Sequence, residues 1–411
     1  MQQEGVQPNS ITYNSLLDGL CKIGKVEEAK DRFRQMVTQG RSPNIVTYAT
    51  LIDGLCKIKK VEEAEDLFRQ MVTQGLSPDI ITYTTLIDGL CKIEKVVEAN
   101  DLFCQMATQG LSPNIITYNT LIDGLCKIGK VEETEDLLCR MVTQGLSPDI
   151  ITYNTLIDGL CKIEKVEEAK DLFCQMVTQG LSPNIISYNT LISGLLKLGK
   201  WEATSRLLEE MKDQGIELDV VTFTTIIDAL CKEGMVEKGY KLLDVMIQRG
   251  LEPNVVTYTT LMDGYCLIQE TSKAFKVFEL MLSRGHKPDT VTYNILINGL
   301  FKEGLLDAFD ELFLSVKKDC YSSDSVMLNA IVKGLLENGE VNRALGSLSE
   351  MNKRKFILGA FTASSIVDLL SKDGHCHHYM KMLPNFSQHC AKSNGINIDS
   401  SISSLIHKIS G

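Results

Sequence analysis

The chain has 411 residues, of which 44% are hydrophobic and 23% charged, and its formal net charge is -11. The balanced composition excludes a disordered or low-complexity chain, and no window approaches the 18 apolar residues of a membrane-spanning helix. The surplus of acids argues against attraction of polyanions by the molecule as a whole, although it leaves room for a locally basic surface.

A unit of 35 residues repeats along the chain without insertion. The block that begins at Ser112 with SPNIITYNTLIDGLCKIGK returns with small changes at Ser42, Ser77, Ser147 and Ser182. The register defines ten repeats, at residues 10–44, 45–79, 80–114, 115–149, 150–184, 185–219, 220–254, 255–289, 290–324 and 325–359. Repetition with such a period is typical of a solenoid, in which each unit stacks only on its neighbours.

Both ends depart from this register. Residues 1–9 match positions 27 to 35 of a unit, so we expect the tail of a truncated preceding repeat there. An Arg-rich, acid-poor transit peptide is absent, which favours a fragment or a truncated gene product. Residues 360–411 are expected to form a degenerate repeat and a C-terminal capping tail.

Each unit divides into two amphipathic helices. Gly at position 31 and Pro at position 34 indicate a helix end followed by a new start. The apolar stripes, spaced as on a helix, are Tyr118, Leu121, Ile122 and Leu125 on a first helix, and Val61, Ala64, Leu67, Phe68 and Met71 on a second. Gly at position 10, as in Gly124, costs about 1 kcal/mol of helix propensity, which indicates close approach of a neighbouring helix. The sequence predicts an all-α fold, an α-solenoid superhelix of tandem 35-residue helix-turn-helix repeats.

Most of the 13 cysteines are copies of two repeat positions. They are Cys21, Cys56, Cys91, Cys126, Cys161, Cys231 and Cys266 at position 12, and Cys104, Cys139 and Cys174 at position 25. Equivalent residues of stacked hairpins lie roughly 10 Å apart, whereas a disulfide needs Cα atoms within about 7 Å. We therefore expect free, buried cysteines that serve packing, in a reducing compartment.

The repeat resembles that of the pentatricopeptide repeat family over about 350 of the 411 residues. The resemblance lies in the segment VTYNTLIDGLCK and in the Gly, EEA, LF, Met, Gly and Pro-Asn or Pro-Asp that follow it in the same unit. The form is that of the plant-type, uninterrupted P class, and the near-identical units resemble the restorer-of-fertility-like subgroup. The resemblance implies a sequence-specific, single-stranded RNA-binding protein in organellar RNA processing, stability or translation. It implies a location in mitochondria ahead of chloroplasts. It further implies no cofactor and no enzymatic activity, with a recruited nuclease or other processing factor as a further partner.

In this family each repeat reads one base through positions 5 and 35. Position 5 carries Asn14, Ala49, Thr84, Asn119, Asn154, Asn189, Thr224, Thr259 and Asn294, and position 35 carries Asn44, Asp79, Asn114, Asp149, Asn184, Asp219, Asn254, Asp289 and Asp324. An acceptor-only Asp suits the ring N–H of uracil or guanine, and an amide donor suits the bare ring nitrogen of cytosine or adenine. The alternative for position 35 is an ordinary helix N-cap. With Y for C or U and N unread at Ala49, the family's code gives 5'-Y-N-A-U-Y-U-A-G-U-3'.

Positions 2, 5, 9 and 13 share one stripe of the first helix, apart from its apolar stripe. The predicted base-sandwiching residues at position 2 are Ile11, Val46, Ile81, Ile116, Ile151, Ile186, Val221, Val256 and Val291. The predicted phosphate-binding residues at position 13 are Lys22, Lys57, Lys92, Lys127, Lys162, Lys197, Lys232 and Lys302, with Leu267 in the eighth repeat. The alternatives are a core or helix-entry residue at position 2 and a cation at the helix C-terminus at position 13. Asp at position 9 is expected to pair with that Lys.

Two other classes of protein were weighed. A protein-interaction solenoid of the tetratricopeptide type shares the hairpins, but its period is 34 and it gives no reason for the alternation at positions 5 and 35. An enzyme or zinc site would have to use the cluster His375, Cys376, His377, His378, His389 and Cys390. Because paired C-x-x-C and H-x-E motifs are absent, we expect no metal and no catalytic residue.

Overall fold

The computed structural model describes residues 9–318, 325–354, 356, 359 and 362. The chain divides into two units, residues 1–217 and 218–411, and each is described by itself. The first unit contains α1 (Ser10–Lys22), α2 (Val26–Thr38), α3 (Ile45–Lys57), α4 (Val61–Thr73), α5 (Ile80–Lys92), α6 (Val96–Thr108), α7 (Ile115–Lys127), the short 3-10 helix η2 (Val131–Glu133), α8 (Thr134–Thr143), α9 (Ile150–Lys162), α10 (Val166–Thr178), α11 (Ile185–Lys197) and α12 (Trp201–Asp213). The second contains α13 (Val220–Lys232), α14 (Val236–Gln248), α15 (Val255–Leu267), α16 (Thr271–Ser283), α17 (Thr290–Lys302), α18 (Leu306–Lys318), α19 (Ser325–Glu337) and α20 (Val341–Lys353).

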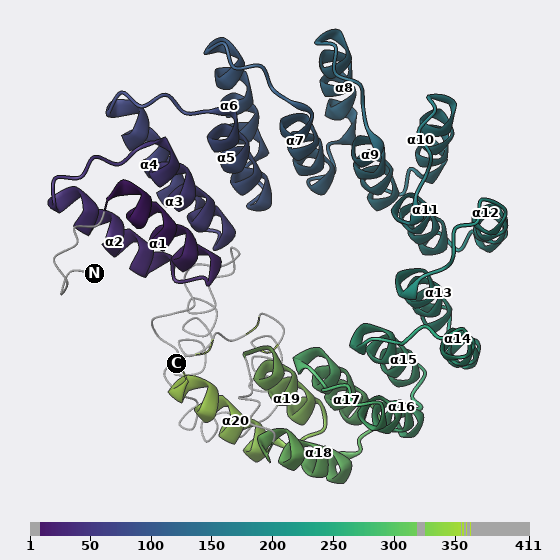
Figure 1. The fold of residues 1–411 in the computed structure, drawn as a ribbon. Coiled ribbons are helices and arrows are strands. Elements are labelled where there is room, and N and C mark those ends of the chain that lie inside the picture. Colours follow the sequence, from purple (N-terminus) through teal and green to yellow (C-terminus); the bar gives the residue numbers. More distant parts are fainter. Residues whose placement is uncertain (1–8, 319–324, 355, 357–358, 360–361, 363–411) are drawn as a thin grey trace, which may run out of the picture. The chain divides into compact units, whose positions relative to one another are not determined.

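The helices of each unit form two layers. Odd-numbered helices lie side by side in one layer, and even-numbered helices cover them in the other (Figure 1). In the first unit α3 contacts α1 and α5, and α4 packs on both α3 and α5. The predicted all-α solenoid is confirmed, since the described residues are helical or lie in turns and include no strand.

The predicted apolar stripes form the core between the layers. Tyr118, Leu121 and Ile122 of α7 are fully buried, and the ring of Tyr118 meets that of Phe103 edge-on at 5.1 Å. On α4 the stripe is narrower than expected, because Leu67 is only partly buried and instead lines a surface groove. The same aromatic pair joins successive hairpins at Phe33–Tyr48, Phe68–Tyr83, Phe173–Tyr188 and Phe278–Tyr293.

Close approach explains the glycine at position 10. A Cβ atom added to Gly89 of α5 would lie 2.5 Å from Sγ of Cys56 on α3, a contact that real side chains do not make. Gly19 of α1 has no such neighbour within 4 Å. The position-12 cysteine of one repeat therefore fills the space above the position-10 glycine of the next, as the helix-propensity cost predicted.

The burial of the cysteines follows their position in the repeat. Position-12 cysteines are buried and free, as predicted, and burial raises the pKa of Cys91 to about 12. The prediction of burial was wrong for Cys104, Cys139 and Cys174, which are exposed. The cause is helical period: Phe103 belongs to the buried stripe of α6, and the residue that follows it turns about 100° away.

One second helix begins differently from the others. Where α4 starts at Val61, the fourth repeat has the 3-10 turn η2 and then α8 from Thr134. Thr134 stands where Ala64 stands in α4, and its Oγ1 donates to the carbonyl of Val131 at 2.5 Å. A side-chain bond to a carbonyl three residues back accompanies the tighter first turn.

Candidate nucleic-acid interface

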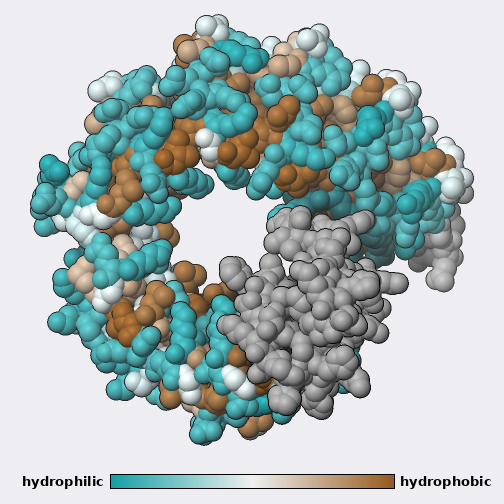
Figure 2. Space-filling model, turned by 180° about the vertical axis from the view of Figure 1, so that it is seen from behind, coloured by the Kyte–Doolittle hydropathy of each residue, from teal (hydrophilic) through white to brown (hydrophobic). Residues whose placement is uncertain are grey.

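The apolar residue at position 2 is exposed in every repeat. Its exposed fraction runs from 56% at Val46 to 73% at Ile11, so the core alternative is wrong. A single exposed valine needs no explanation, but one at the same place in ten successive repeats forms a regular row. In Figure 2 the visible surface is mostly hydrophilic with separate apolar patches.

The residue at position 35 caps the helix that follows it. The side-chain Oδ1 of Asn114 accepts the backbone N–H of Thr117 at 3.0 Å, and that of Asp289 accepts the N–H of Thr292 at 2.8 Å. The N-cap interpretation is therefore confirmed from Asn44 to Asp289, where Asn and Asp both serve. A cap uses only Oδ1, so it gives no reason for the difference between an amide and a carboxylate.

Positions 5 and 35 of one repeat, which we call its reading pair, lie within hydrogen-bond distance in the first and fourth repeats, where position 5 is Asn. Nδ2 of Asn14 donates to Oδ1 of Asn44 at 3.3 Å, and Nδ2 of Asn119 donates to Oδ1 of Asp149 at 3.3 Å. The reading pair of Asn189 and Asp219 falls on different units. Asp324 of the ninth pair lies outside the described residues.

Threonine at position 5 is held closer to its own helix than asparagine. Oγ1 of Thr84 donates to the carbonyl of Ile80 at 2.8 Å, and Thr224 and Thr259 make the same bond four residues back. A threonine in this orientation extends less far from the helix than an asparagine.

The carboxylate of Asp149 is held in its ionised form. Burial alone would raise its pKa, but hydrogen bonds from the backbone and hydroxyl of Thr152 and from Asn119 outweigh this effect, so the pKa lies below the ordinary value. Asp149 therefore presents acceptors only at neutral pH, which is the chemistry that a ring N–H needs.

The lysines at position 13 pair with the aspartates at position 9, as predicted. Nζ–Oδ2 distances are 2.5 to 2.8 Å in the pairs Lys22–Asp18, Lys57–Asp53, Lys92–Asp88, Lys127–Asp123, Lys162–Asp158 and Lys232–Asp228. The bond to Asp53 raises the pKa of Lys57, so its ammonium stays charged. Exposed pairs of this kind contribute only about 0–1 kcal/mol, and a phosphate can therefore displace or share them.

Three repeats depart from this pairing. Position 9 is Ser193 before Lys197 and Asn298 before Lys302, and neither lysine forms an ion pair with a described residue. In the eighth repeat Asp263 has Leu267 in place of a lysine; burial raises the pKa of its carboxyl, and Lys302 partly offsets the effect. Lys197 and Lys302 are thus the two lysines of the row without an ion pair to a described carboxylate.

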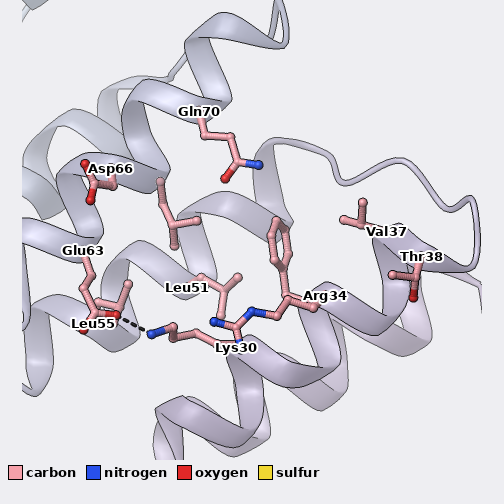
Figure 3. Close-up of a pocket in the computed structure, with 11 residues that line it drawn as sticks. Lys30, Arg34, Val37, Thr38, Leu51, Leu55, Glu63, Asp66 and Gln70 are labelled. Atoms are coloured by element: carbon pink, nitrogen blue, oxygen red, sulfur yellow. Dashed lines mark hydrogen bonds and ion pairs between the residues drawn. The ribbon is translucent and has the colours of Figure 1, made fainter.

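Many of the other charged side chains lie on the even-numbered helices. Lys30 of α2 forms an ion pair with Glu63 of α4 (Figure 3). Both residues line a groove of about 490 Å³, which Leu51 and Leu55 of α3 also line. Lys60 likewise pairs with Glu27 at 2.5 Å. Many of the acids that dominate the net charge are therefore on the layer away from the reading pairs and partly neutralised there.

The described residues contain no group of His, Cys, Asp and Glu that could hold a metal ion, and no helix among them is long and apolar enough to cross a membrane. The cluster from His375 to Cys390 lies outside the described residues.

A set of residues that the sequence analysis did not single out lies behind the reading pairs. These are the hydroxyl residues at position 3 of the second to the ninth repeat, which are buried: Thr47, Thr82, Thr117, Thr152, Ser187, Thr222, Thr257 and Thr292. Their near-constancy in the repeat was the available signal, but it is equally expected of a scaffold residue.

The fold and the interface define a solenoid of 35-residue helical hairpins that presents one polar pair and one exposed apolar residue per repeat. The family model described as PPR repeat family matches residues 8–57, 43–92, 79–127, 113–162, 148–197, 183–232, 218–267 and 268–302. A second model, described as PPR repeat, matches residues 291–321 and 326–356. The chain therefore belongs to the pentatricopeptide repeat (PPR) family. No curated protein sequence gave a significant match.

A comparison with solved structures found matches to PPR10 and to yeast Rmd9p. Maize PPR10 is 24% identical, with 93% of this chain and 64% of PPR10 covered and a TM-score of 0.48. PPR10 in complex with an 18-nt psaJ RNA element is 23% identical, with 92% and 60% covered and a TM-score of 0.57. Yeast Rmd9p in complex with a 16-nt target RNA is 12% identical, with 91% and 88% covered and a TM-score of 0.46. The chain thus spans about three fifths of the length of PPR10.

Proposed function

We propose that this chain binds single-stranded RNA in a sequence-specific way, one base per repeat, and has no catalytic activity of its own. The observation that carries the proposal is the reading pair, exemplified by Asn14 and Asn44 at 3.3 Å, which lies one helical turn from the exposed side chain of Ile11. A polar pair beside an apolar surface suits a nucleobase, which has hydrogen-bonding edges and a flat apolar face.

Three kinds of side chain would divide the work of binding. The apolar residues at position 2 would sandwich the bases, the reading pairs would bond to the base edges, and the lysines at position 13 would contact the phosphates. PPR10, whose fold this chain shares, was solved in complex with RNA, which supports the same class of ligand here.

The reading pairs specify the proposed target. Thr with Asn suits adenine, Thr with Asp guanine, Asn with Asp uracil, and Asn with Asn either pyrimidine. With the RNA running 5' to 3' along the chain, the nine pairs from Asn14 to Asp324 correspond to 5'-Y-N-A-U-Y-U-A-G-U-3'. Ala49 offers no hydrogen bond, so the second base is unread.

The cellular role proposed here is organellar RNA processing, stability or translation, in a mitochondrion ahead of a chloroplast. The uninterrupted 35-residue register and the near-identity of the units support membership of the plant P class and of its restorer-of-fertility-like subgroup. Cleavage of a bound transcript would need a recruited nuclease as partner.

A gel-shift titration tests this function. The ligand is an RNA that contains the nonamer, and the competitors are the same RNA annealed to its complement and an RNA of shuffled sequence. We expect a complex with the single strand alone, because duplex bases are stacked on one another and cannot enter between protein side chains. Equal binding of the duplex, or no RNA binding with capture of peptides instead, would favour a protein-interaction solenoid.

A further inference from the structure

In the first, third, fourth, seventh and eighth repeats, both members of the reading pair are contacted from behind by the buried threonine at position 3 of the next repeat. Oγ1 of Thr152 lies 2.7 Å from Oδ1 of Asn119 and 2.9 Å from Oδ1 of Asp149. Asn119 itself donates to Asp149 at 3.3 Å, so the three side chains form a closed set of contacts. Thr47 stands in the same relation to Asn14 and Asn44, with distances of 2.7 and 2.9 Å.

Repeats with threonine at position 5 use the same hydroxyl. Oγ1 of Thr84 lies 2.8 Å from Oγ1 of Thr117, and Oγ1 of Thr259 lies 3.4 Å from Oγ1 of Thr292. In these repeats the threonine at position 3 therefore contacts position 5 whether that residue is Asn or Thr. Its own rotation is restricted, because it is fully buried and branched at Cβ.

The contact also decides which atom of position 35 faces a ligand. Oδ1 of Asp149 accepts the backbone N–H of Thr152 at 2.9 Å and Nδ2 of Asn119 at 3.3 Å, and Oγ1 of Thr152 lies 2.9 Å from the same oxygen. Two donors on one oxygen fix the rotation of the end group. What distinguishes Asn from Asp is then the other atom, an amide N–H donor or a second carboxylate acceptor.

The fifth repeat provides a natural comparison. The position-3 residue that follows it is Ser187, which lacks the γ-methyl group that restricts rotation of threonine. Its Oγ lies 3.2 Å from Oδ1 of Asn184, and Oδ1 of Asn154 is buried with no hydrogen-bond partner among the described residues. Oδ1 of Asn294 in the ninth repeat, which Met327 follows, is likewise buried with no hydrogen-bond partner among the described residues, so Oδ1 at position 5 lacks this contact in both repeats that no threonine follows.

We propose that the hydroxyl residue at position 3 is a positioning residue for base recognition: it orients both members of the preceding reading pair and thereby sets how sharply that repeat discriminates between bases. The inference rests on the proposed function, since it concerns the selectivity of the same interface. Thr152 would act on the fourth base through Asn119 and Asp149, and Ser187 would leave the fifth base less strictly read.

The test compares Thr152→Val with Thr292→Val in the full chain. Each substitution keeps the shape of the side chain and removes one hydroxyl from one N-terminal cap, so both should lower the Tm alike. Kd is measured for the nonamer RNA and for versions with each base at positions four and eight. We expect Thr152→Val to lower discrimination at the fourth base about three- to tenfold, as expected for one lost hydrogen bond, and Thr292→Val to do so at the eighth base only.

Two further variants make the result decisive. Thr152→Ser should retain part of the selectivity that Thr152→Val loses, and Ser187→Thr should sharpen pyrimidine over purine at the fifth base without weakening the fold. If the valine variants weaken all RNAs equally, or keep the wild-type ratios, the hydroxyl is only a structural cap and the inference is overturned. If the wild-type protein itself shows no base preference, the proposed function fails, and this inference fails with it.

Discussion

Replacement of Asp289 by Asn is expected to change the preferred eighth base of the RNA from G to A. Thr259 and Asp289 form the reading pair of the eighth repeat, and Asp accepts the ring N–H of guanine where Asn can donate to the bare ring nitrogen of adenine. The preference should move by about 1–3 kcal/mol, the usual value of a base contact. Competition binding with four RNAs that differ only at the eighth base measures the change.

The substitution Asp289→Asn should not lower the stability of the protein, so a change in base preference would not be due to unfolding. Asn caps helices as well as Asp does, and Asn254 caps α15 with the same bond to the N–H of Thr257, at 3.0 Å, that Asp289 makes to Thr292. Asp149→Asn is the matched control, because it should relax the choice of the fourth base and leave G preferred at the eighth. Equal weakening with all four RNAs, or a continued preference for G in Asp289→Asn, would refute the code for this chain.

A rise in salt concentration from 50 to 200 mM should lower the binding constant for RNA by about a thousandfold or more. Eight lysines at position 13, each with one phosphate, give a slope of log K against log salt of about -5 to -6, at roughly 0.7 per contact with a single strand. Titrations at four or five salt concentrations measure the slope. The contact is to the backbone, so the slope should be the same for RNAs of different sequence.

Single substitutions distinguish the lysines. Lys127→Ala should weaken all RNAs alike and make the slope shallower by about 0.7. Lys197→Ala should cost more affinity, since Lys127 is already paired with Asp123 at 2.5 Å and Lys197 has no described carboxylate partner. An unchanged slope in both variants would assign these lysines to the helix C-terminus alone.

The helices could be predicted from sequence because the signals are local and repeated. The position of α7 and its equivalents follows from three signals: the 35-residue period, the glycine at position 31 and the apolar stripe of Tyr118 to Leu125. Leu67 and the position-25 cysteines, such as Cys104, could not be placed as well, since a hydrophobic residue at the margin of a stripe can face either way. Their exposure depends on how α4, α6 and their equivalents pack on the odd-numbered helices on either side.

The interface was harder to predict than the fold. The row at position 2 left core and surface open, and the exposed fraction of 73% at Ile11 settles it. Position 35 posed a choice between a cap and a base reader, yet the geometry makes these compatible, because the cap uses Oδ1 alone. The role of Thr152 depends on contacts with Asn119, 33 residues earlier, which no local pattern reveals.

The most direct measurement of the central claim, that each repeat reads one base through its own pair, is selection of RNAs from a random pool by the wild-type chain. The account predicts enrichment of A at the third and seventh positions of the site, U at the fourth, sixth and ninth, G at the eighth, a pyrimidine at the first and fifth, and no preference opposite Ala49. Enriched RNAs with no such register, or with equal bases at every position, would contradict it.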